Sequence, residues 1–331
     1  MLGWKKVRPY FRGGFRIYKG LTGFFYDVNR YIRFGGWRGE MSDPDIREYN
    51  SAMANHGLEK SLSYKNRNPN SGWKNAYKIL GLLNVASKTN SITYHDKASK
   101  STLTKFINLQ ENLNDSRVKD IDEKLKLYDF SSKDEHGHLA YSSYDFEKGK
   151  LSNPESFFYS RFSLREYKDM TISDKLIQRG VKLALKTPSV CNRQPWHIYH
   201  TSDKEVILTA LKYQSGNRPF GDKVRNLIVV TVDLKAFFGG NEHYQHWIDG
   251  GLISMSLMYA FHSLGLATCA LNWSQTPKND KAIREVIDIK GAHTIIMMLA
   301  IGIPNKDNLV CYSSRRPLNE FFTDLHLKDK N

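Results

Sequence analysis

The stretch that decides the fold is Thr187-Pro188-Ser189-Val190-Cys191-Asn192-Arg193-Gln194-Pro195-Trp196. A helix is predicted just before it, over residues 174–186, because apolar residues recur there on one helical face. Pro188 cannot continue a helix, so the chain turns where the polar run begins. The donors and acceptors gathered in this turn suit an uncharged planar ligand rich in heteroatoms better than a metal or a phosphate.

Downstream of this turn, strand-like and helical patterns alternate. Four short runs, rich in apolar and β-branched residues, are predicted to be strands: 205–210, 227–232, 267–270 and 294–301. The run from Leu252 to Leu264 is apolar nearly all round, which predicts a buried central helix closed by Gly265. The second part of the chain is therefore expected to be an α+β domain over residues 156–331.

The first part of the chain is predicted to be a helical, basic extension over residues 1–155. Asp43-Pro44-Asp45 is typical of a helix start, since proline is tolerated in a first turn. Residues 73–85 form a further predicted helix. The polar stretch 86–155 is expected to hold one or two surface helices and a linker to the second domain.

A strong positive charge, +15 over the chain, calls for an explanation. Residues 1–40 contain nine Lys and Arg against Asp27 and Glu40. Aromatic and apolar residues are interleaved with them: Trp4, Tyr10, Phe11, Phe15, Ile17, Tyr18, Phe24, Phe25 and Tyr26. We expect these to pack on the rest of the protein below a solvated basic face. Contact with an anionic membrane surface or polymer is the alternative, and nucleic acid is not expected as a partner.

Several classes of protein do not match the sequence. No run approaches the eighteen apolar residues of a spanning helix, and no secretory signal is recognisable. Three widely spaced cysteines indicate a reducing compartment, so we expect a cytoplasmic protein. The cluster Glu242-His243-Tyr244-Gln245-His246 lacks the histidine spacing of zinc proteases, so no metal is expected. Walker, Gly-x-Ser-x-Gly and Gly-x-Gly-x-x-Gly motifs are missing.

The quoted stretch resembles the asparagine-x-glutamine-proline-tryptophan loop of the FMN-dependent nitroreductase family. Further elements follow in that family's order: Arg161-Phe162-Ser163-Leu164-Arg165, Asp249-Gly250-Gly251, Ala300-Ile301-Gly302-Ile303-Pro304 and Ser314-Arg315-Arg316-Pro317-Leu318. The resemblance covers roughly residues 160–322. It implies a nitroreductase-like mixed sheet flanked by helices, and a homodimer with FMN at the subunit interface.

The resemblance also implies which side chains hold the flavin phosphate. Arginine forks match phosphate oxygens in pairs. The implied phosphate ligands come from two clusters, Arg161, Ser163 and Arg165 in one and Arg315 and Arg316 in the other.

Further residues are implied along the flavin rings and the ribityl chain. Ser189, Cys191 and Asn192 would contact them, with Gln194 supporting the loop. Asn272 and Trp273 would bring a backbone N–H near the reactive nitrogen. Better-known relatives often have a glutamate-glycine pair there, so the identity of that donor stays open. Arg218 is expected either near the flavin carbonyls or in solvent.

The resemblance implies an FMN-dependent oxidoreductase. NADH or NADPH would deliver a hydride to FMN, which would pass it to a small-molecule acceptor in a ping-pong cycle, so no protein nucleophile is required. Two alternatives stay open. One is a basic protein with a structural flavin, whose N-terminal arm docks on an anionic polymer or membrane surface. The other is specialised family chemistry such as reductive dehalogenation.

Overall fold

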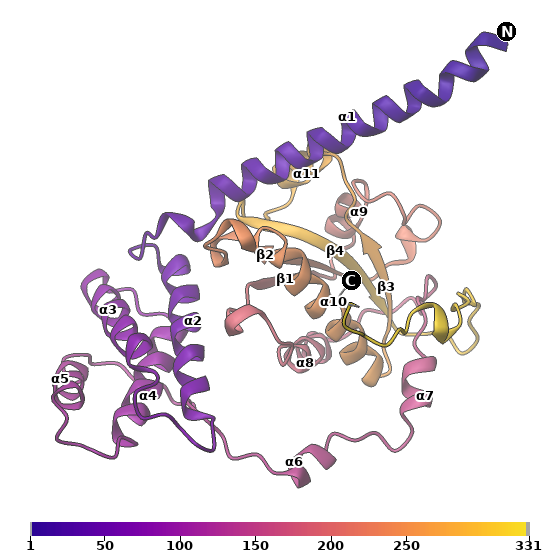
Figure 1. Ribbon diagram of the computed structural model, residues 1–331. Helices are drawn as coiled ribbons and strands as arrows, with labels where there is room; N and C mark the ends of the chain where they lie inside the picture. Colours follow the sequence, from indigo (N-terminus) through magenta and orange to yellow (C-terminus); the bar gives the residue numbers. More distant parts are fainter. Residues whose placement is uncertain (1, 329–331) are drawn as a thin grey trace.

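The computed structural model describes residues 2–328 and centres on one antiparallel sheet (Figure 1). The strand order is β1-β2-β4-β3, with β1 Trp196–Thr201, β2 Asn226–Asp233, β3 Ala267–Asn272 and β4 His293–Gly302. The strands predicted over 227–232, 267–270 and 294–301 are confirmed, and so is the α+β class. Among residues 2–328, parallel pairing is limited to an isolated bridge between Ser163 and Thr268.

Helices cover both faces of the sheet, and their bounds are α8 Asp174–Ala184, α9 Lys204–Leu211, α10 Gln245–Ser263 and α11 Pro277–Val286. Successive side chains of a strand point to opposite faces. Val229 of β2 accordingly packs in the core formed with α9 and α11, whereas Ile228 and Val230 pack in the core formed with α8 and α10. The sheet is thus the middle layer of three.

The structure overturns one predicted strand and adds another. Residues 205–210 belong to helix α9, because the Asp203 carboxylate accepts from the backbone N–H groups of Glu205 and Val206 and begins a helix there. Ile207 and Leu211, at helical spacing, then face the core. The added strand is β1, in which Trp196 is buried and antiparallel pairing with β2 begins.

The predicted central helix is confirmed as α10, but its burial all round is wrong, because Leu252 is 42% exposed and only the face with Ile253, Leu257 and Phe261 is buried. That face packs closely on the sheet. A Cβ on Gly250 would lie 2.5 Å from the Ile296 side chain of β4, so a larger residue would push the helix away. Gly265 follows the helix with a φ of +73°, the left-handed conformation that ends helices. The absence of a side chain at Gly250 therefore allows α10 to lie directly against β4, and Gly265 lets the chain turn from α10 into β3.

The region before the sheet is a helical bundle with its own core. Its helices are α2 Pro44–Leu62, α3 Trp73–Thr89, α4 Tyr94–Asn108 and α5 Ser116–Leu125. The predicted helix starts at Pro44 and Trp73 are confirmed. The surface character expected for 86–155 is wrong for α4, because Leu103 and Phe106 are fully buried against α2 and α3. The short helices α6 Ser143–Glu147 and α7 Pro154–Tyr159 lead to the sheet domain.

Helix α2 is joined to the sheet domain by polar contacts. The Tyr49 hydroxyl donates to the buried carboxylate of Asp233 at 3.1 Å. Lys235 Nζ donates to Asp43 and Asp45, at 2.9 Å each. The bundle therefore contacts the segment that follows β2.

The long first helix, α1 Leu2–Phe34, packs on the sheet domain through its C-terminal half. Packing predicted for the aromatic residues is seen for Tyr26, which is half-buried, but not for Phe15, Tyr18 and Phe25, which are exposed. The side chains of Trp4, Tyr10 and Phe11 lie outside the described part of the structure. Across residues 2–328, none of the helices has the combined length and apolarity that crossing a membrane requires.

Candidate functional site

Three arginines and three serines, among them Ser163, line one cavity of about 740 Å³. Arg161, Ser163 and Arg165 come from the segment between α7 and α8, and Arg315 comes from the chain after β4. Side chains of α10 complete the lining. Residues about 150 positions apart in the sequence thus meet at one place, as the resemblance implies.

Strand β3 positions the first three of these side chains. The Leu164 N–H donates to the Thr268 carbonyl at 3.1 Å, and the Leu164 side chain is buried in the core. Because neighbouring side chains of an extended segment point in opposite directions, burial of Leu164 leaves Ser163 and Arg165 facing the cavity.

The cavity has an excess of positive charge. Arg165 Nη1 lies 3.4 Å from the Cys311 sulfur, and Arg315 Nη1 donates to the Ser313 carbonyl. Within residues 2–328, no carboxylate lies within 4.0 Å of Arg161, Arg165 or Arg315. Three guanidinium groups with free donors, together with the Ser163 hydroxyl, suit an anion with several oxygens, such as a phosphate.

The structure does not bring Arg316 to this cavity. Its guanidinium pairs with Glu320 at 3.4 Å and lies over the ring of Phe321. Arg315 and Arg316 are adjacent in sequence, but their side chains reach different surroundings, and only Arg315 lines the cavity.

The polar turn after α8 has strained backbone geometry. Cys191, Asn192 and Gln194 have φ values of 49°, 53° and 51°, which side-chain-bearing residues seldom adopt. The Ser189 hydroxyl accepts from the Gln194 N–H at 2.9 Å, and Gln194 Nε2 lies 3.3 Å from Asn192 Oδ1. Backbone strain of this kind is often found at ligand sites, where the surrounding structure holds it in place.

Arg193 anchors the turn from within. Its side chain is only 3% exposed, and it donates to both carboxylate oxygens of Glu242, at 2.8 and 3.0 Å. It also donates to the Ala236 carbonyl and lies 3.4 Å from the Met53 sulfur of α2. Arg193 is one of the donors in the quoted stretch that were expected to serve a ligand, but its side chain is turned away from the surface.

The buried carboxyl group of Asp249 and the partly exposed one of Glu242 flank the turn. Burial would raise the pKa of Glu242, but the hydrogen bonds and charge of Arg193 hold that pKa below its ordinary value. Burial raises the pKa of Asp249, which accepts from the Val190 N–H and from Gln245. Glu242 therefore belongs to an ion pair with Arg193, and Asp249 joins α10 to the turn. Within residues 2–328, no three His, Cys, Asp or Glu side chains are arranged to hold a metal.

Asn272 and Trp273 lie at the far end of β3 from the arginine cavity. Thr268 is four residues before Asn272, so the two ends are about 14 Å apart along the strand. The Asn272 carbonyl accepts from Gln214, and Trp273 Nε1 donates to Asp280 at 2.9 Å. The Trp273 ring is thus held in place by α11.

The structure reveals a contribution from α1 that the sequence analysis missed. Tyr26 and Arg30 line a cavity of about 350 Å³ together with Asn272, Trp273 and Trp247. Arg30 is 7% exposed and donates to the His293 carbonyl at 3.1 Å, and burial lowers the pKa of its guanidinium. The basic and aromatic composition of residues 1–40 made this segment stand out in the sequence. No local sequence pattern, however, could predict that it contacts the end of β3.

Arg218 lines neither the arginine cavity nor the cavity at Asn272. It lines a cavity of about 600 Å³ with Asn217 and Asp222, before β2. The residues implied by the resemblance therefore form the arginine cavity, the polar turn, the end of β3 and this loop. Ser189, Cys191, Asn192 and Gln194 of the turn line neither the arginine cavity nor the cavity at Asn272.

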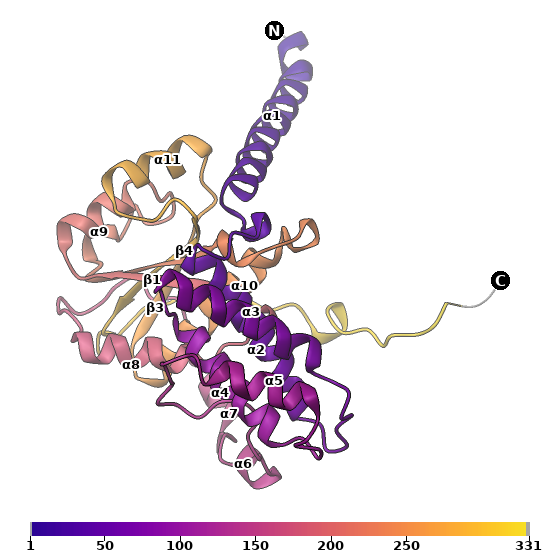
Figure 2. The same ribbon diagram turned by 90° about the vertical axis from the view of Figure 1, so that its left-hand side faces the viewer.

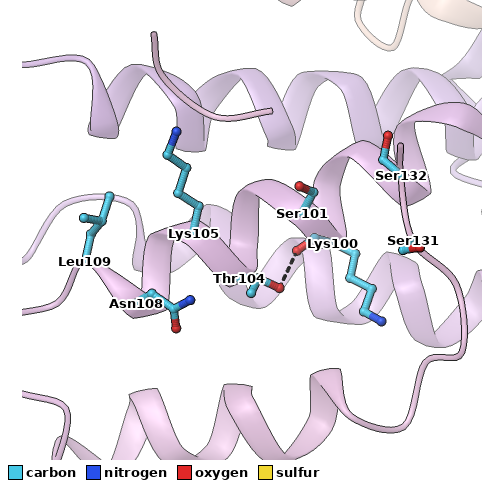
Figure 3. A pocket seen from close by; sticks show the side chains of 8 residues that line it. All are labelled: Lys100, Ser101, Thr104, Lys105, Asn108, Leu109, Ser131 and Ser132. Atoms are coloured by element: carbon cyan, nitrogen blue, oxygen red, sulfur yellow. Dashed lines mark hydrogen bonds between the residues drawn. The ribbon is translucent and has the colours of Figure 1, made fainter. Parts of the chain in front are cut away.

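A further cavity, of about 500 Å³, lies on α4 in the helical bundle (Figure 3). Its two lysines point apart, and both are engaged. Lys100 Nζ donates to the Phe130 carbonyl and Lys105 Nζ to the His138 carbonyl, at 3.0 Å each. We assign no ligand to it.

Comparison with known proteins identifies the family. Residues 159–237 match the model of the nitroreductase family. An Archaeoglobus fulgidus protein named "Putative NADH dehydrogenase/NAD(P)H nitroreductase" is 30% identical over 153 residues, covering 45% of this chain and 84% of that protein. This chain belongs to the nitroreductase family.

Two further matches are more distant. A Bacillus subtilis protein named "Putative NAD(P)H nitroreductase YodC" is 23% identical over 209 residues, covering 52% of this chain and 99% of that protein. The structure named "FMN-dependent Nitroreductase" from Clostridium difficile superposes with a TM-score of 0.44 and 20% identity, covering 51% of this chain and 98% of that one.

Proposed function

We propose that this protein is an FMN-dependent oxidoreductase that takes electrons from NADH or NADPH and reduces a small-molecule acceptor. The observation that carries the proposal is the arginine cavity. Arg161, Arg165 and Arg315 converge there with Ser163, and no carboxylate among the described residues neutralises them. These four side chains would hold the FMN phosphate, and FMN would supply the two-electron chemistry.

Strand β3 connects the two ends of the proposed flavin site. The phosphate ligands meet β3 at Thr268, and Asn272 and Trp273 end the same strand about 14 Å away. In our proposal the flavin rings lie toward the Asn272 end. A backbone N–H there would stabilise charge that develops on the flavin during hydride transfer.

We infer that the working form is a homodimer. In one chain, the polar turn does not line the arginine cavity, although both carry implied flavin contacts. β3 is an edge strand of the described sheet, and the segment after β4 extends from the body with exposed apolar side chains such as Leu309 and Leu325 (Figure 2). A second subunit would cover this segment and bring its own polar turn to the cavity.

The test is the cofactor and its reduction. The purified protein should be yellow, should release FMN and not FAD on denaturation, and should bleach when NADH or NADPH is added without oxygen. A released cofactor that runs as FAD on chromatography would overturn the assignment of the arginine cavity. A flavin that neither nicotinamide reduces would instead favour the alternative of a structural flavin.

A further inference from the structure

One side of α1 presents an uninterrupted apolar stripe to solvent. It consists of Tyr18, Leu21, Phe25, Val28 and Ile32, which are 63%, 50%, 73%, 54% and 53% exposed. The spacing of three and four residues places them on one face of the helix. No described residue covers this stripe, although its side chains are as apolar as those of the core.

The opposite side of α1 holds the helix to the body. The Tyr26 hydroxyl donates to Asp280 at 2.7 Å, and Arg30 donates to the His293 carbonyl. These contacts fix the rotation of the helix about its axis, so the stripe points away from the sheet domain. Figures 1 and 2 show the N-terminal part of α1 projecting beyond the rest of the molecule.

Positive charge accompanies the stripe. Arg16 and Lys19 are exposed. Each precedes a residue of the stripe, Tyr18 or Leu21, by two positions, so each lies about 200° around the helix axis from that residue. Over its whole length α1 contains eight Lys and Arg and a single acid, Asp27. An apolar face backed by a basic face is the pattern of helices that lie in a membrane–water interface.

A second copy of the chain fits these features less well. The exposed Ile17 and Phe24 flank the stripe and widen the apolar face beyond the narrow seam of a coiled coil. Pairing two such helices would also bring together two basic segments with one acid each. An anionic lipid surface complements both the width of the apolar face and the charge.

We propose that α1 docks this protein on an anionic membrane surface, with the apolar stripe inserted among the lipid headgroups and the basic side chains attracted to their charge. The cavity at Asn272 and Trp273 then lies directly under the docked helix, since Tyr26 and Arg30 line it. This proposal does not depend on the proposed FMN chemistry, because lipid binding and flavin content are measured separately.

The experiment is sedimentation of the full chain with vesicles of phosphatidylcholine alone or mixed with phosphatidylglycerol. We expect binding to the mixed vesicles that weakens at high salt, and little binding to the neutral ones. Leu21→Glu/Phe25→Glu should reduce binding to mixed vesicles at least about tenfold. Leu127→Glu/Leu139→Glu, which adds the same charge at two exposed leucines outside α1, should bind like the wild type.

A second pair of variants tests the charge. Arg16→Gln/Lys19→Gln should weaken binding to mixed vesicles about 30-fold, whereas Lys65→Gln/Lys133→Gln should not. Circular dichroism checks that each variant is folded. The proposal is overturned if the wild type ignores mixed vesicles, or if the stripe variant binds them unchanged. It is also overturned if light scattering shows that the stripe only holds two copies together and lipid has no effect.

Discussion

Arg193 and Glu242 form a bidentate ion pair, at 2.8 and 3.0 Å, which joins the polar turn after α8 to the segment before α10. The turn contains Ser189, Cys191, Asn192 and Gln194, which are proposed flavin contacts. Because the pair is largely shielded from water, it holds the strained turn in one conformation.

Replacing Arg193 with Met should destabilise the protein by about 3 kcal/mol, because Glu242 and the Ala236 carbonyl lose their donor in a buried place. Urea unfolding at pH 7 measures the change. Arg225→Met is the matched control, since Arg225 pairs with the exposed Asp169 and its loss should cost less than about 1 kcal/mol. Equal losses in the two variants would contradict the anchoring role of Arg193.

Arg165→Ala and Arg315→Ala should each weaken FMN binding by about 1.5–3 kcal/mol, the usual contribution of a hydrogen bond to a charged group. The double variant should be mostly flavin-free. Fluorescence titration of stripped protein with FMN measures both. Arg316→Ala is the control, because its guanidinium pairs with Glu320 outside the cavity. Full flavin occupancy in the double variant would place the phosphate elsewhere.

Cofactor binding and dimerisation should be coupled. If the flavin lies between two subunits, FMN at about a hundredfold excess over its dissociation constant should stabilise the dimer by roughly 2.7 kcal/mol. Adding FMN to dilute stripped protein should raise the melting temperature and shift monomer to dimer in light scattering. Tight FMN binding to a persistent monomer would rule out an interfacial site.

Stability should fall in mild acid through His246. Burial, with the nearby charges of Arg30 and His243, lowers the pKa of this side chain from 6.5 to about 4. Between pH 6.5 and pH 4 the unfolded chain binds a proton at this side chain that the folded protein does not bind. The free energy of unfolding is therefore highest above pH 6.5 and falls as the pH is lowered toward 4. The slope is up to about 1.4 kcal/mol per pH unit.

The comparison of His246→Phe with the wild type isolates that contribution. Aromatic rings of Tyr31, Phe237 and Trp247 surround His246, and its Nδ1 has no hydrogen-bond partner among the described residues, so Phe should be accepted. Urea unfolding at pH 7 and pH 5 should show a smaller acid loss in this variant. His200→Gln, at an exposed histidine, should leave the loss unchanged. If His246→Phe loses as much stability between pH 7 and pH 5 as the wild type and His200→Gln do, His246 does not cause the loss in acid.

A chain shortened to begin at Asn153 tests the proposed division at residue 155. It keeps the buried residues of both sheet cores but loses Tyr31 and Tyr49, which pack against one of them. Asp233 and Asp280 also lose the hydrogen bonds of Tyr49 and Tyr26. We expect it to fold and to bind FMN while unfolding at lower urea concentration than the full chain. A chain beginning at Met41 separates the loss of α1 from that of α2. If the Asn153 chain folds but is a flavin-free monomer, the extension belongs to the active assembly.

Local patterns in the sequence were enough to predict much of the architecture. Pro188 stops a helix and Gly265 closes one through properties of their own backbones, wherever they are placed. The apolar runs in β2 and β4 are buried on both faces, so they read as strands without knowledge of their partners. Family motifs located the arginine cavity because Arg161, Ser163 and Arg165 are close in sequence.

Tertiary structure decided what depends on contacts between distant residues. The run 205–210 has the composition of a strand, but the Asp203 cap and the core under Ile207 make it a helix. Arg315 faces the cavity and Arg316 does not, since Glu320 lies within reach of only one of them. The composition of residues 1–40 predicts a basic, aromatic-rich helical segment. Only the anchoring of Tyr26 and Arg30 on residues some 250 positions away determines that its apolar face meets solvent, because that rotation is set by packing and not by periodicity.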